Sequence, residues 1–423
     1  MTGTAIVIGA GITGVAAALN LARDGWRVTL VDPRDPGDPG QTSFGNAGLL
    51  AHASIVPVQT PGLIWRAPRM LFDPREPLFL RWRYLPRLMP WLAPFLRNGS
   101  EARLARIVPA IQALVHDSLD QHRALAAGTP AAGLIAAQDY GFLFRDRAAF
   151  ARSAFAFGLK AAHGLTWEER EAARLRADDP MLGPEFGFAA VFSNHGWIAD
   201  PGAYVAALAG ALQRLGGIRL RAEARAILPG EGGAEVETGA GRLRADRVVL
   251  AAGVWSRGLA ERLGLRVPLE TERGYHLTLA RPSHRPPFPY MLDSRALVAT
   301  PMAPGLRFAG MVEFGGTAAP PSEAPARLIR RAVRALYPGL TWEGETRWMG
   351  HRPTTIDSLP MVGAPAGAPN VLLAFGGQHL GLTMGAKLGR VVADLAGGRR
   401  QNLDLEPYAP ERFGAPAFDH RSV

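Results

Sequence analysis

The chain has 423 residues, of which 48% are hydrophobic, and this is enough to bury the cores of two or three domains. It contains no cysteine, which excludes disulfides, thiolate catalysis, cysteine-ligated metal sites and a flavin bound covalently through cysteine. Because no apolar run is long enough to span a membrane and no signal peptide is visible, we expect a cytoplasmic protein.

The formal net charge is +10, which is compatible with an anionic partner. Only Lys160 and Lys387 are lysines among the 47 basic residues, so 45 are arginines. These arginines are spread along the chain without a dense basic run, which is typical of a solvated, arginine-rich surface. We therefore expect no nucleic-acid partner.

The chain begins with a pattern typical of dinucleotide binding. Residues 4–8 form an apolar strand, a G-x-G-x-x-G turn and a helix follow at once, and a second strand ends on Asp32. Gly9 permits the tight turn, Gly11 leaves the backbone open to a pyrophosphate, and Gly14 lets the helix pack closely on the strand. The helix N-terminus attracts the pyrophosphate, and the Asp32 carboxylate can accept hydrogen bonds from ribose hydroxyls.

Residues 61–98 combine tryptophan and arginine with prolines and leucines. This composition suits a membrane interface, where aromatic rings lie among headgroups and arginine meets lipid phosphate. It also suits a helical subdomain with buried tryptophans and solvated arginines. Peripheral contact with the inner membrane face is therefore an alternative to a fully cytoplasmic location.

Two later segments favour FAD over NAD as the cofactor. A buried strand runs into Ala251, Ala252 and Gly253, followed by Trp255, where small residues let the backbone pass close to a cofactor. Near the C-terminus, a glycine-rich loop over residues 376–383, here called the flavin loop, precedes a helix. The helix N-terminus would stabilise the negative charge on the pyrimidine edge of a reduced flavin, an edge that NAD lacks. The loop residues expected at the cofactor are Gly376, Gly377, His379, Gly381, Leu382 and Thr383.

These segments, in this order, resemble the D-amino-acid dehydrogenases within the wider family of glycine oxidases, sarcosine oxidases and D-amino-acid oxidases. The resemblance implies an α/β (α+β) fold, with a Rossmann-like FAD-binding domain and a second, mainly antiparallel-sheet substrate domain. It also implies non-covalent FAD, with Ser43, Asn46 and Gly48 at the cofactor. Many relatives carry glutamate where this chain has Asp32, which shortens the reach by one methylene. The motifs are residues 9–14 with Asp32, 42–48, 199–202, 251–253, and 351–353 with 377–379.

The predicted domains are each assembled from separated pieces of the chain. The FAD-binding domain is expected from residues 1–52, 197–256 and 345–400. The substrate domain is expected from residues 53–196 and 257–344, and residues 401–423 form a C-terminal tail.

Oxidation of an amine at a flavin requires a clamp for the substrate carboxylate, and the planar fork of arginine suits this role. Arg352, beside the flavin loop, is the first candidate, and an ion pair with Asp357 is the alternative reading. Arg273 and Tyr275 alternate onto one face of a strand. In the family, the corresponding strand faces the substrate.

Two histidines complete the candidate site: His379 lies in the flavin loop, and His52 follows the motif over residues 42–48. No metal-ligand spacing is visible, so no metal is expected. The predicted reaction is oxidation of a D-amino acid, or of a cyclic imino acid of the D-proline or D-hydroxyproline type, to the imine by hydride transfer from Cα to flavin N5.

Other functions remain open from the sequence. They are a glycine- or sarcosine-type oxidase that uses O₂, a flavin subunit of a larger complex, and the flavin half of an RNA-modifying enzyme. The electron acceptor is accordingly either a quinone of the respiratory chain or O₂.

Overall fold

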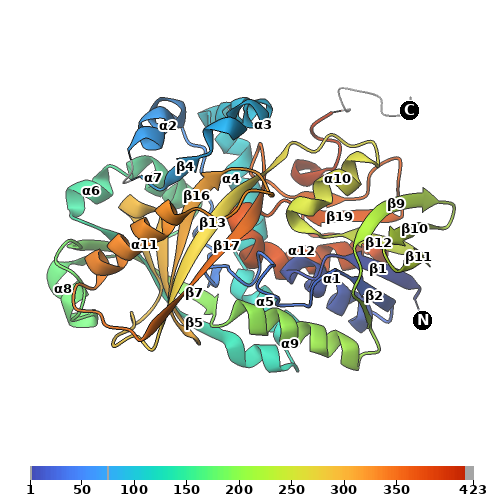
Figure 1. Ribbon diagram of the computed structural model, residues 1–423, viewed down its shortest axis with the longest axis horizontal. Helices are drawn as coiled ribbons and strands as arrows, with labels where there is room; N and C mark the ends of the chain where they lie inside the picture. The colour runs from blue at the N-terminus through green and yellow to red at the C-terminus, as the bar shows by residue number, and fades with distance from the viewer. Residues whose placement is uncertain (1, 74–75, 415–423) are drawn as a thin grey trace.

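The computed structural model describes residues 2–73 and 76–414. Two sheets lie side by side along the long axis of the molecule, and helices cover their outer faces (Figure 1). The chain passes between the two sheets several times, so each sheet is built from segments that are far apart in the sequence. This mixed α/β architecture confirms the predicted fold class.

The smaller sheet, on the right of Figure 1, has six strands in the order β18-β19-β12-β1-β2-β8. All neighbours are parallel except β18 and β19. Its central strands are nearly continuous apolar runs because both faces of the sheet are covered. The strands are β1 (Thr4–Ile8), β2 (Arg27–Val31), β8 (Ile218–Leu220), β12 (Arg247–Leu250), β18 (Met361–Gly363) and β19 (Val371–Phe375).

Helices cover one face of this sheet and a small antiparallel sheet covers the other. Helix α1 packs against α9 and α12, and the approach to α12 is so close that a Cβ on Gly389 would lie 2.5 Å from the Cβ of Ala16. On the opposite face, Ile227 and Val236 pack in one apolar cluster with Ile8. These elements are α1 (Ile12–Arg23), α9 (Pro201–Arg214), α12 (Gly381–Ala396), β9 (Ala224–Gly230), β10 (Gly233–Thr238) and β11 (Gly241–Ala245).

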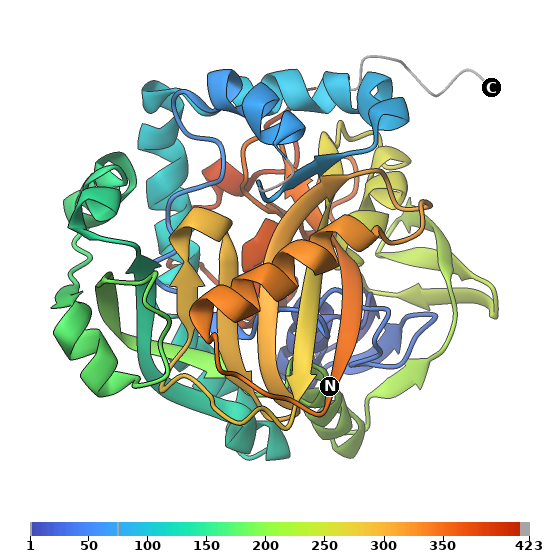
Figure 2. The same ribbon diagram turned by 60° about the vertical axis from the view of Figure 1, so that its left-hand side comes forward.

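The larger sheet runs in the order β17-β13-β16-β15-β14-β5-β7-β3, with β4 beside β16 and β6 beside β7. Helix α11 (Glu323–Leu336) crosses one of its faces (Figure 2) and buries Ile329, Val333 and Leu336 in a cluster with Leu277 and Phe308. The strands are β3 (Leu49–Leu50), β4 (Leu78–Leu80), β5 (Ile135–Phe144), β6 (Glu168–Glu171), β7 (Phe188–Ile198), β13 (Leu269–Ala280), β14 (Tyr290–Leu292), β15 (Leu297–Met302), β16 (Gly305–Phe314) and β17 (Gly344–Thr355).

Each of the two larger sheets, with the helices around it, forms one lobe of the molecule, and the remaining helices complete these two lobes. Helices α2 and α3 lie along the top of the molecule in both views, and α4 and α5 pack against α12 (Figures 1 and 2). Within residues 2–73 and 76–414, no helix is both long and apolar enough to cross a membrane. The bounds are α2 (Leu63–Phe72), α3 (Leu85–Arg97), α4 (Glu101–Val115), α5 (Ser118–Ala126), α6 (Arg147–Ala151), α7 (Ala154–Ala162), α8 (Ala172–Asp178) and α10 (Ser256–Glu261), with short 3₁₀ turns η1 (Trp82–Tyr84), η2 (Pro130–Leu134), η3 (Gly253–Trp255), η4 (Asp293–Arg295), η5 (Gln378–Leu380) and η6 (Glu406–Tyr408).

The elements predicted around the nucleotide motif are confirmed. The strand predicted over residues 4–8 is β1, the helix predicted after the G-x-G-x-x-G turn is α1, and the strand predicted to end on Asp32 is β2. The division into domain pieces stays a prediction, but its boundary at residue 345 cuts into β17, which pairs along its whole length with β13 of the larger sheet. Of the predicted tail over 401–423, residues 415–423 lie outside the described residues.

Candidate active site

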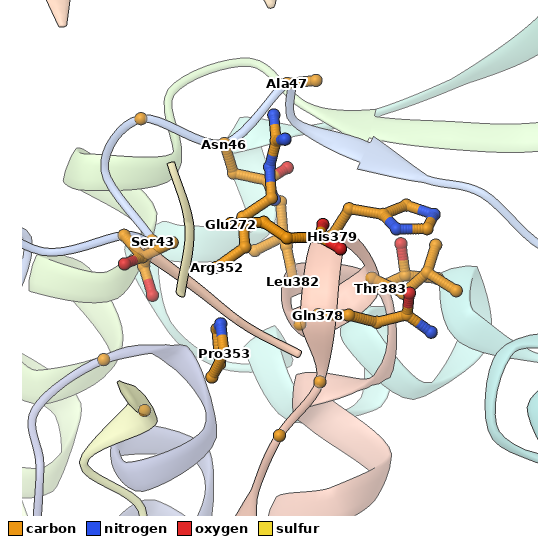
Figure 3. Close-up of a pocket in the computed structure, with 18 of the residues that line it drawn as sticks. Ser43, Asn46, Ala47, Glu272, Arg352, Pro353, Gln378, His379, Leu382 and Thr383 are labelled. Carbon is orange, nitrogen blue, oxygen red and sulfur yellow. The ribbon is translucent and has the colours of Figure 1, made fainter. Parts of the chain in front are cut away.

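A cavity of about 1250 Å³ extends from the glycine-rich turn after β1, past the start of α12, to the inner sides of α2 and α3. Residues of both sheets line it, among them Gly11 at one end and Leu63 and Leu92 at the other. Figure 3 shows side chains from both lobes converging on it. The cavity is elongated, so it can hold an extended cofactor together with a small substrate.

The turn after β1 leaves no room for side chains. Gly9 has φ +106°, and a Cβ on it would lie 2.5 Å from the carbonyl oxygen of Ala251. A Cβ on Gly14 would fall on the carbonyl oxygen of Gly9. The first N–H of α1, on Ile12, is 3.0 Å from Ser43 Oγ, which accepts its hydrogen bond. The bare helix N-terminus beside a hydroxyl fits the pyrophosphate of FAD.

Asp32 lies at the end of β2 and lines the cavity. Its carboxylate accepts hydrogen bonds from the backbone N–H of Ala10, at 2.7 Å, and of Arg34, at 2.8 Å. Burial raises the pKa of Asp32, although both hydrogen bonds favour its ionised form. The carboxylate is thus held beside the nucleotide turn, and its contact with a ribose stays a prediction.

A buried arginine that was not predicted from the sequence fixes the segment over residues 42–48. Arg307, on β16, is 3% exposed, and its Nη1 donates to the carbonyl oxygens of Phe44 (3.0 Å) and Asn46 (2.7 Å). Asn46 Oδ1 accepts from the N–H of Gly48, whose φ is +80°. Burial lowers the pKa of Arg307 to about 10, so the guanidinium remains charged at neutral pH.

The flavin loop forms as predicted, between β19 and α12. Gln378, at φ +44°, makes the turn, and its Nε2 donates to the carbonyl oxygen of Ser358 at 2.6 Å. The following helix starts at Gly381 without a side-chain cap, directly after the 3₁₀ turn η5. Buried His122 anchors this start, because its Nε2 lies 2.9 Å from the carbonyl oxygen of Leu382.

Most residues predicted at the cofactor line the cavity. Gly14 and Gly48 do not, and they act instead on the backbone shape that frames it. The lining residues of the predicted set are Gly9, Gly11, Asp32, Ser43, Asn46, Ala252, Gly253, Trp255, Gly376, Gly377, His379, Gly381, Leu382 and Thr383.

Arg352 lines the cavity from β17, and three backbone features hold its guanidinium there. Its Nη1 donates to the carbonyl oxygen of Met311 (2.8 Å) and its Nη2 to that of Gly310 (3.3 Å). Met311 has φ +61° and lies where the β13–β16 register shifts, so a β-bulge aims these carbonyls at the arginine. Gly274 lies under the guanidinium, which would collide with a Cβ there.

The alternative reading of Arg352 as the partner of Asp357 is wrong. Asp357 pairs with Arg412 instead, with Arg412 Nε 2.8 Å from its Oδ2. Two of the five N–H donors of Arg352 serve the two carbonyls, so the fork keeps donors for a carboxylate in the cavity.

Glu272 is a lining residue that the sequence reading missed. It lies directly opposite Arg352 in the β13–β17 ladder and is 2% exposed. Burial raises the pKa of Glu272, while the positive charge of Arg352 opposes that rise. The signal was present in the alternation of β13, because Glu272 faces the cavity when its neighbour Arg273 faces away.

The predicted position of Arg273 at the substrate is wrong. Arg273 is 0% exposed; its Nη1 is 2.8 Å from Glu313 Oε2, and its Nη2 donates to the carbonyl oxygens of Ala319 and Pro320. Tyr275 borders the cavity with its ring, but its hydroxyl donates to Glu313 at 2.5 Å. Arg273 and Tyr275 share the face of β13 that looks toward α11, so alternation removes Arg273 from the clamp position, whereas a substrate contact of Tyr275 stays a prediction.

The two predicted histidines lie in different surroundings. His379 borders the cavity, and burial, reinforced by the charge of Arg352, lowers its pKa to about 4. It is therefore neutral at physiological pH. His52 is not among the lining residues, and its ring lies against that of His195, with centroids 3.8 Å apart. The suggestion that His52 lines the pocket is thus wrong.

The wall away from the nucleotide turn is mainly apolar. Tyr140, Phe142, Met291 and Val298 line it. The Tyr140 hydroxyl is buried and has no hydrogen-bond partner among the described residues. Behind this wall, the Nζ of buried Lys160 lies 3.9 Å from the centroid of the Phe142 ring, and burial lowers its pKa to about 7.

Comparison with known proteins gives consistent results at the level of sequence. The model of the family described as FAD dependent oxidoreductase (DAO) matches residues 4–395. A D-amino-acid oxidase of Bradyrhizobium diazoefficiens is 37% identical over 413 residues, which cover 96% of this chain and 98% of the relative. A D-amino acid dehydrogenase of Sinorhizobium medicae is 32% identical over 420 residues, or 97% and 99% of the two chains.

Solved structures share the fold at lower identity. Glycine oxidase from Geobacillus kaustophilus has a TM-score of 0.70 at 20% identity, covering 97% of this chain and 98% of its own. L-proline dehydrogenase from P. horikoshii has a TM-score of 0.71 at 19% identity, covering 97% of each chain. At these identities the likeness concerns the fold alone.

Proposed function

The chain belongs to the family of FAD-dependent oxidoreductases, and on that premise we propose that it oxidises the Cα–N bond of a D-amino acid or of a cyclic imino acid. The family and the cofactor predicted from the sequence are thereby confirmed. The observation that carries the proposal is the guanidinium of Arg352, held at the cavity wall by backbone carbonyls with donors to spare. The names of the relatives at 37% and 32% identity support the D-amino acid class.

The residues present fit FAD in three places. The N-terminus of α1, at Gly11, would hold the pyrophosphate, and Asp32 would hold the ribose. The N-terminus of α12, at Gly381, would face the pyrimidine edge of the flavin. When bound, FAD supplies the acceptor for the hydride that leaves Cα.

Arg352 would bind the substrate carboxylate in a two-point contact and so fix the position of Cα. The guanidinium has a fixed orientation, because it donates to two carbonyls and packs against the backbone of Gly274. Such positioning accounts for a large part of rate enhancement when the chemistry needs little help from side chains. The apolar wall around Phe142 and Met291 then favours aliphatic, aromatic or cyclic side chains over charged ones.

The test is anaerobic mixing of the FAD-loaded protein with a panel of D- and L-amino acids, D-proline, D-hydroxyproline, glycine and sarcosine. Loss of flavin absorbance reports reduction, and we expect it with apolar or cyclic D-substrates. Reduction by simple amines without a carboxylate, in preference to all amino acids, would reject the proposal. Reoxidation of the reduced protein by O₂ and by a soluble quinone then compares the two acceptors.

We also propose that an exposed apolar surface attaches the protein to an anionic membrane. Among the described residues, six of the eleven exposed large hydrophobic side chains lie between Val58 and Met89, and Trp65 is 83% exposed. Exposed arginines flank them, as interfacial helices require. The alternative of buried tryptophans holds only for Trp91 in this segment. The six residues, here called the α2–α3 face, are Val58, Ile64, Trp65, Phe72, Trp82 and Met89.

Helix α2 has a second apolar side, which faces the cavity. Leu63, Ala67 and Met70 on the inner side of α2 line the cavity. A membrane-bound α2 would therefore lie between the bilayer and the active site, which favours a lipid-soluble quinone as the electron acceptor.

Co-sedimentation with vesicles of anionic and of neutral lipids tests this contact. We expect binding to anionic vesicles at low salt, with a large loss for the double variant Trp65→Ser and Phe72→Ser. Leu215→Ser is the matched control, because Leu215 is also exposed but follows α9, outside the α2–α3 face. Equal binding by the double variant, or no binding by the native protein, would reject the membrane contact.

A further inference from the structure

We infer that Glu272 binds the α-amino group of the substrate and accepts the proton that this group must lose before oxidation. The inference rests on the proposed function, because it needs a substrate that carries both an amine and a carboxylate. Glu272 would bind the amino group of the substrate, and Arg352 would bind its carboxylate.

The ladder between β13 and β17 places these two side chains together. Glu272 and Arg352 are direct cross-strand partners in antiparallel register, so their side chains emerge on the same face of the sheet. Both line the cavity, and Figure 3 shows them with His379 at its centre. The charge of Arg352 acts to lower the pKa of Glu272, although no ion pair within 4 Å joins these two described residues.

A carboxylate at this depth requires a reason. Glu272 is 2% exposed, and burial of a carboxylate is costly unless a cation or hydrogen-bond donors compensate it. Arg352 uses two donors on carbonyls of β16, and the Thr354 side chain is the other group that favours ionised Glu272, so the carboxylate keeps acceptor capacity for a further donor. An α-amino acid brings an ammonium group beside its own carboxylate. With that carboxylate on Arg352, the ammonium can complete the surroundings of Glu272.

The neighbouring titratable group does not compete for this role. His379 has a pKa lowered to about 4 by burial, so it is a weak base beside a carboxylate whose own pKa is raised by burial. Glu270, two residues earlier on the same strand, is also buried, but it is not a lining residue and its carboxylate accepts from the Tyr84 hydroxyl. Glu272 is thus the carboxylate of β13 that the cavity offers to an amine.

The reaction balances with this assignment. An N–H bond of the ammonium breaks, its proton passes to a Glu272 oxygen, and the electron pair stays on nitrogen. The Cα–H bond then breaks with its electron pair, which the bound FAD accepts, and the nitrogen lone pair forms the C=N bond of the iminium product. Glu272 returns its proton to solvent, and water hydrolyses a primary iminium to the keto acid and ammonium.

Two isosteric ligands that cannot be oxidised separate amine recognition from carboxylate recognition. They are 2-aminoisobutyrate and pivalate, in which a methyl group replaces the amine. Their dissociation constants are measured on the FAD-loaded protein by calorimetry and by perturbation of the flavin spectrum. We expect the native protein to prefer 2-aminoisobutyrate by about 10- to 100-fold, as a charge-assisted hydrogen bond predicts.

Glu272→Gln should remove that preference and leave the affinity for pivalate within about 3-fold of native. Glu270→Gln is the matched control, because it neutralises another buried carboxylate of β13 outside the cavity and should keep the preference. If Glu272→Gln does not load FAD, Glu272→Asp retracts the carboxylate by one methylene and should reduce the preference.

Three results would overturn the inference. An unchanged preference in both Glu272 variants would show that another group binds the amine. Equal losses for both ligands would show that Glu272 only orients Arg352. A native protein that binds pivalate and 2-aminoisobutyrate equally rejects the role of Glu272 but keeps the carboxylate clamp, whereas one that binds neither rejects the proposed function itself.

Discussion

The two ends of the cavity are built in different ways. At the nucleotide end, the contacts come from consecutive backbone groups, and the glycines there matter for the side chains they lack. At the end where we propose that the substrate binds, the proposed contacts come from Arg352 and Glu272, two charged side chains that strand register places opposite each other across eighty residues of sequence. A site made of local backbone is fixed by a short motif. A site made of cross-strand side chains depends on the whole sheet.

Gly14→Val should have the largest effect, because it tests whether the nucleotide end tolerates any side chain. The first carbon would fall on the carbonyl oxygen of Gly9, so β1 and α1 would have to separate. We expect loss of bound FAD and a destabilisation of about 3 kcal/mol or more. Flavin content per chain and thermal unfolding measure both. Gly258→Ala in α10 is the control, because a Cβ there meets nothing within 4 Å; native flavin content in Gly14→Val would refute the close packing.

Arg352→Ala tests the substrate end in the same way. It should reduce kcat/KM by about 2–4 kcal/mol, on the order of 10²–10³-fold, with the flavin spectrum nearly unchanged. Arg352→Lys keeps the charge but loses the fork, so it should also be impaired. Asp357→Ala should lower the thermal midpoint without this kinetic defect, because Asp357 pairs with Arg412. Parental turnover by Arg352→Ala would disprove the clamp.

His122 combines the two kinds of construction, because its buried side chain holds the backbone at the start of α12. Its protonation can be tested by varying the pH. Burial lowers its pKa to about 4, so between about pH 6.5 and pH 4 the unfolded chain binds more protons than the folded one. The contribution of neutral His122 to the free energy of unfolding is complete above pH 6.5. It decreases as the pH falls, by on the order of 3 kcal/mol at pH 4.

Urea unfolding between pH 4 and pH 7.5 measures this loss. His122→Gln should flatten the curve, whereas a change at exposed His116 should leave it as steep as before. An equally steep curve for His122→Gln would assign the acid sensitivity to the other buried histidines.

Asp32→Ala should have the smallest effect of the four. It removes the proposed ribose contact and leaves the N–H groups of Ala10 and Arg34 without their acceptor. We expect FAD binding to weaken by roughly 1.5–3 kcal/mol, the range for a hydrogen bond to a charged group. Retention of flavin on dilution measures it. Retention equal to native would mean that Asp32 serves only the turn.

What could be predicted from the sequence follows the same division between local backbone motifs and contacts between distant strands. The nucleotide turn, the Ala251–Gly253 strand end and the flavin loop could be identified because each is a contiguous segment whose residue types have a local physical reason. The choice of Arg352 also rested on a contiguous motif. Arg307 could not be found in this way, because its role depends on the carbonyls of Phe44 and Asn46, which lie more than two hundred and fifty residues away.

The face of β13 was misjudged for a related reason. Alternation shows that Arg273 and Glu272 point in opposite directions, but it does not show which direction is the cavity. That choice follows from α11, which packs with Tyr275 and Leu277, so Arg273 is buried away from the cavity although Tyr275 still borders it. The register shift at Met311, which aims a carbonyl at Arg352, likewise has no signature in a single strand.

Strand β17 stays paired with β13 as far as Thr355, and Thr354 also forms a bridge with Gly377 of the flavin loop. The clamp and the loop are therefore mechanically one piece, and relative movement of the two lobes cannot change the distance between them by much. The wall formed by Tyr140, Met291 and Val298 lies on β5, β14 and β15, which β13 and β16 separate from β17 in the same sheet. Substitutions in this wall can therefore exchange one substrate side chain for another over evolutionary time while the reacting bond stays in register with the cofactor.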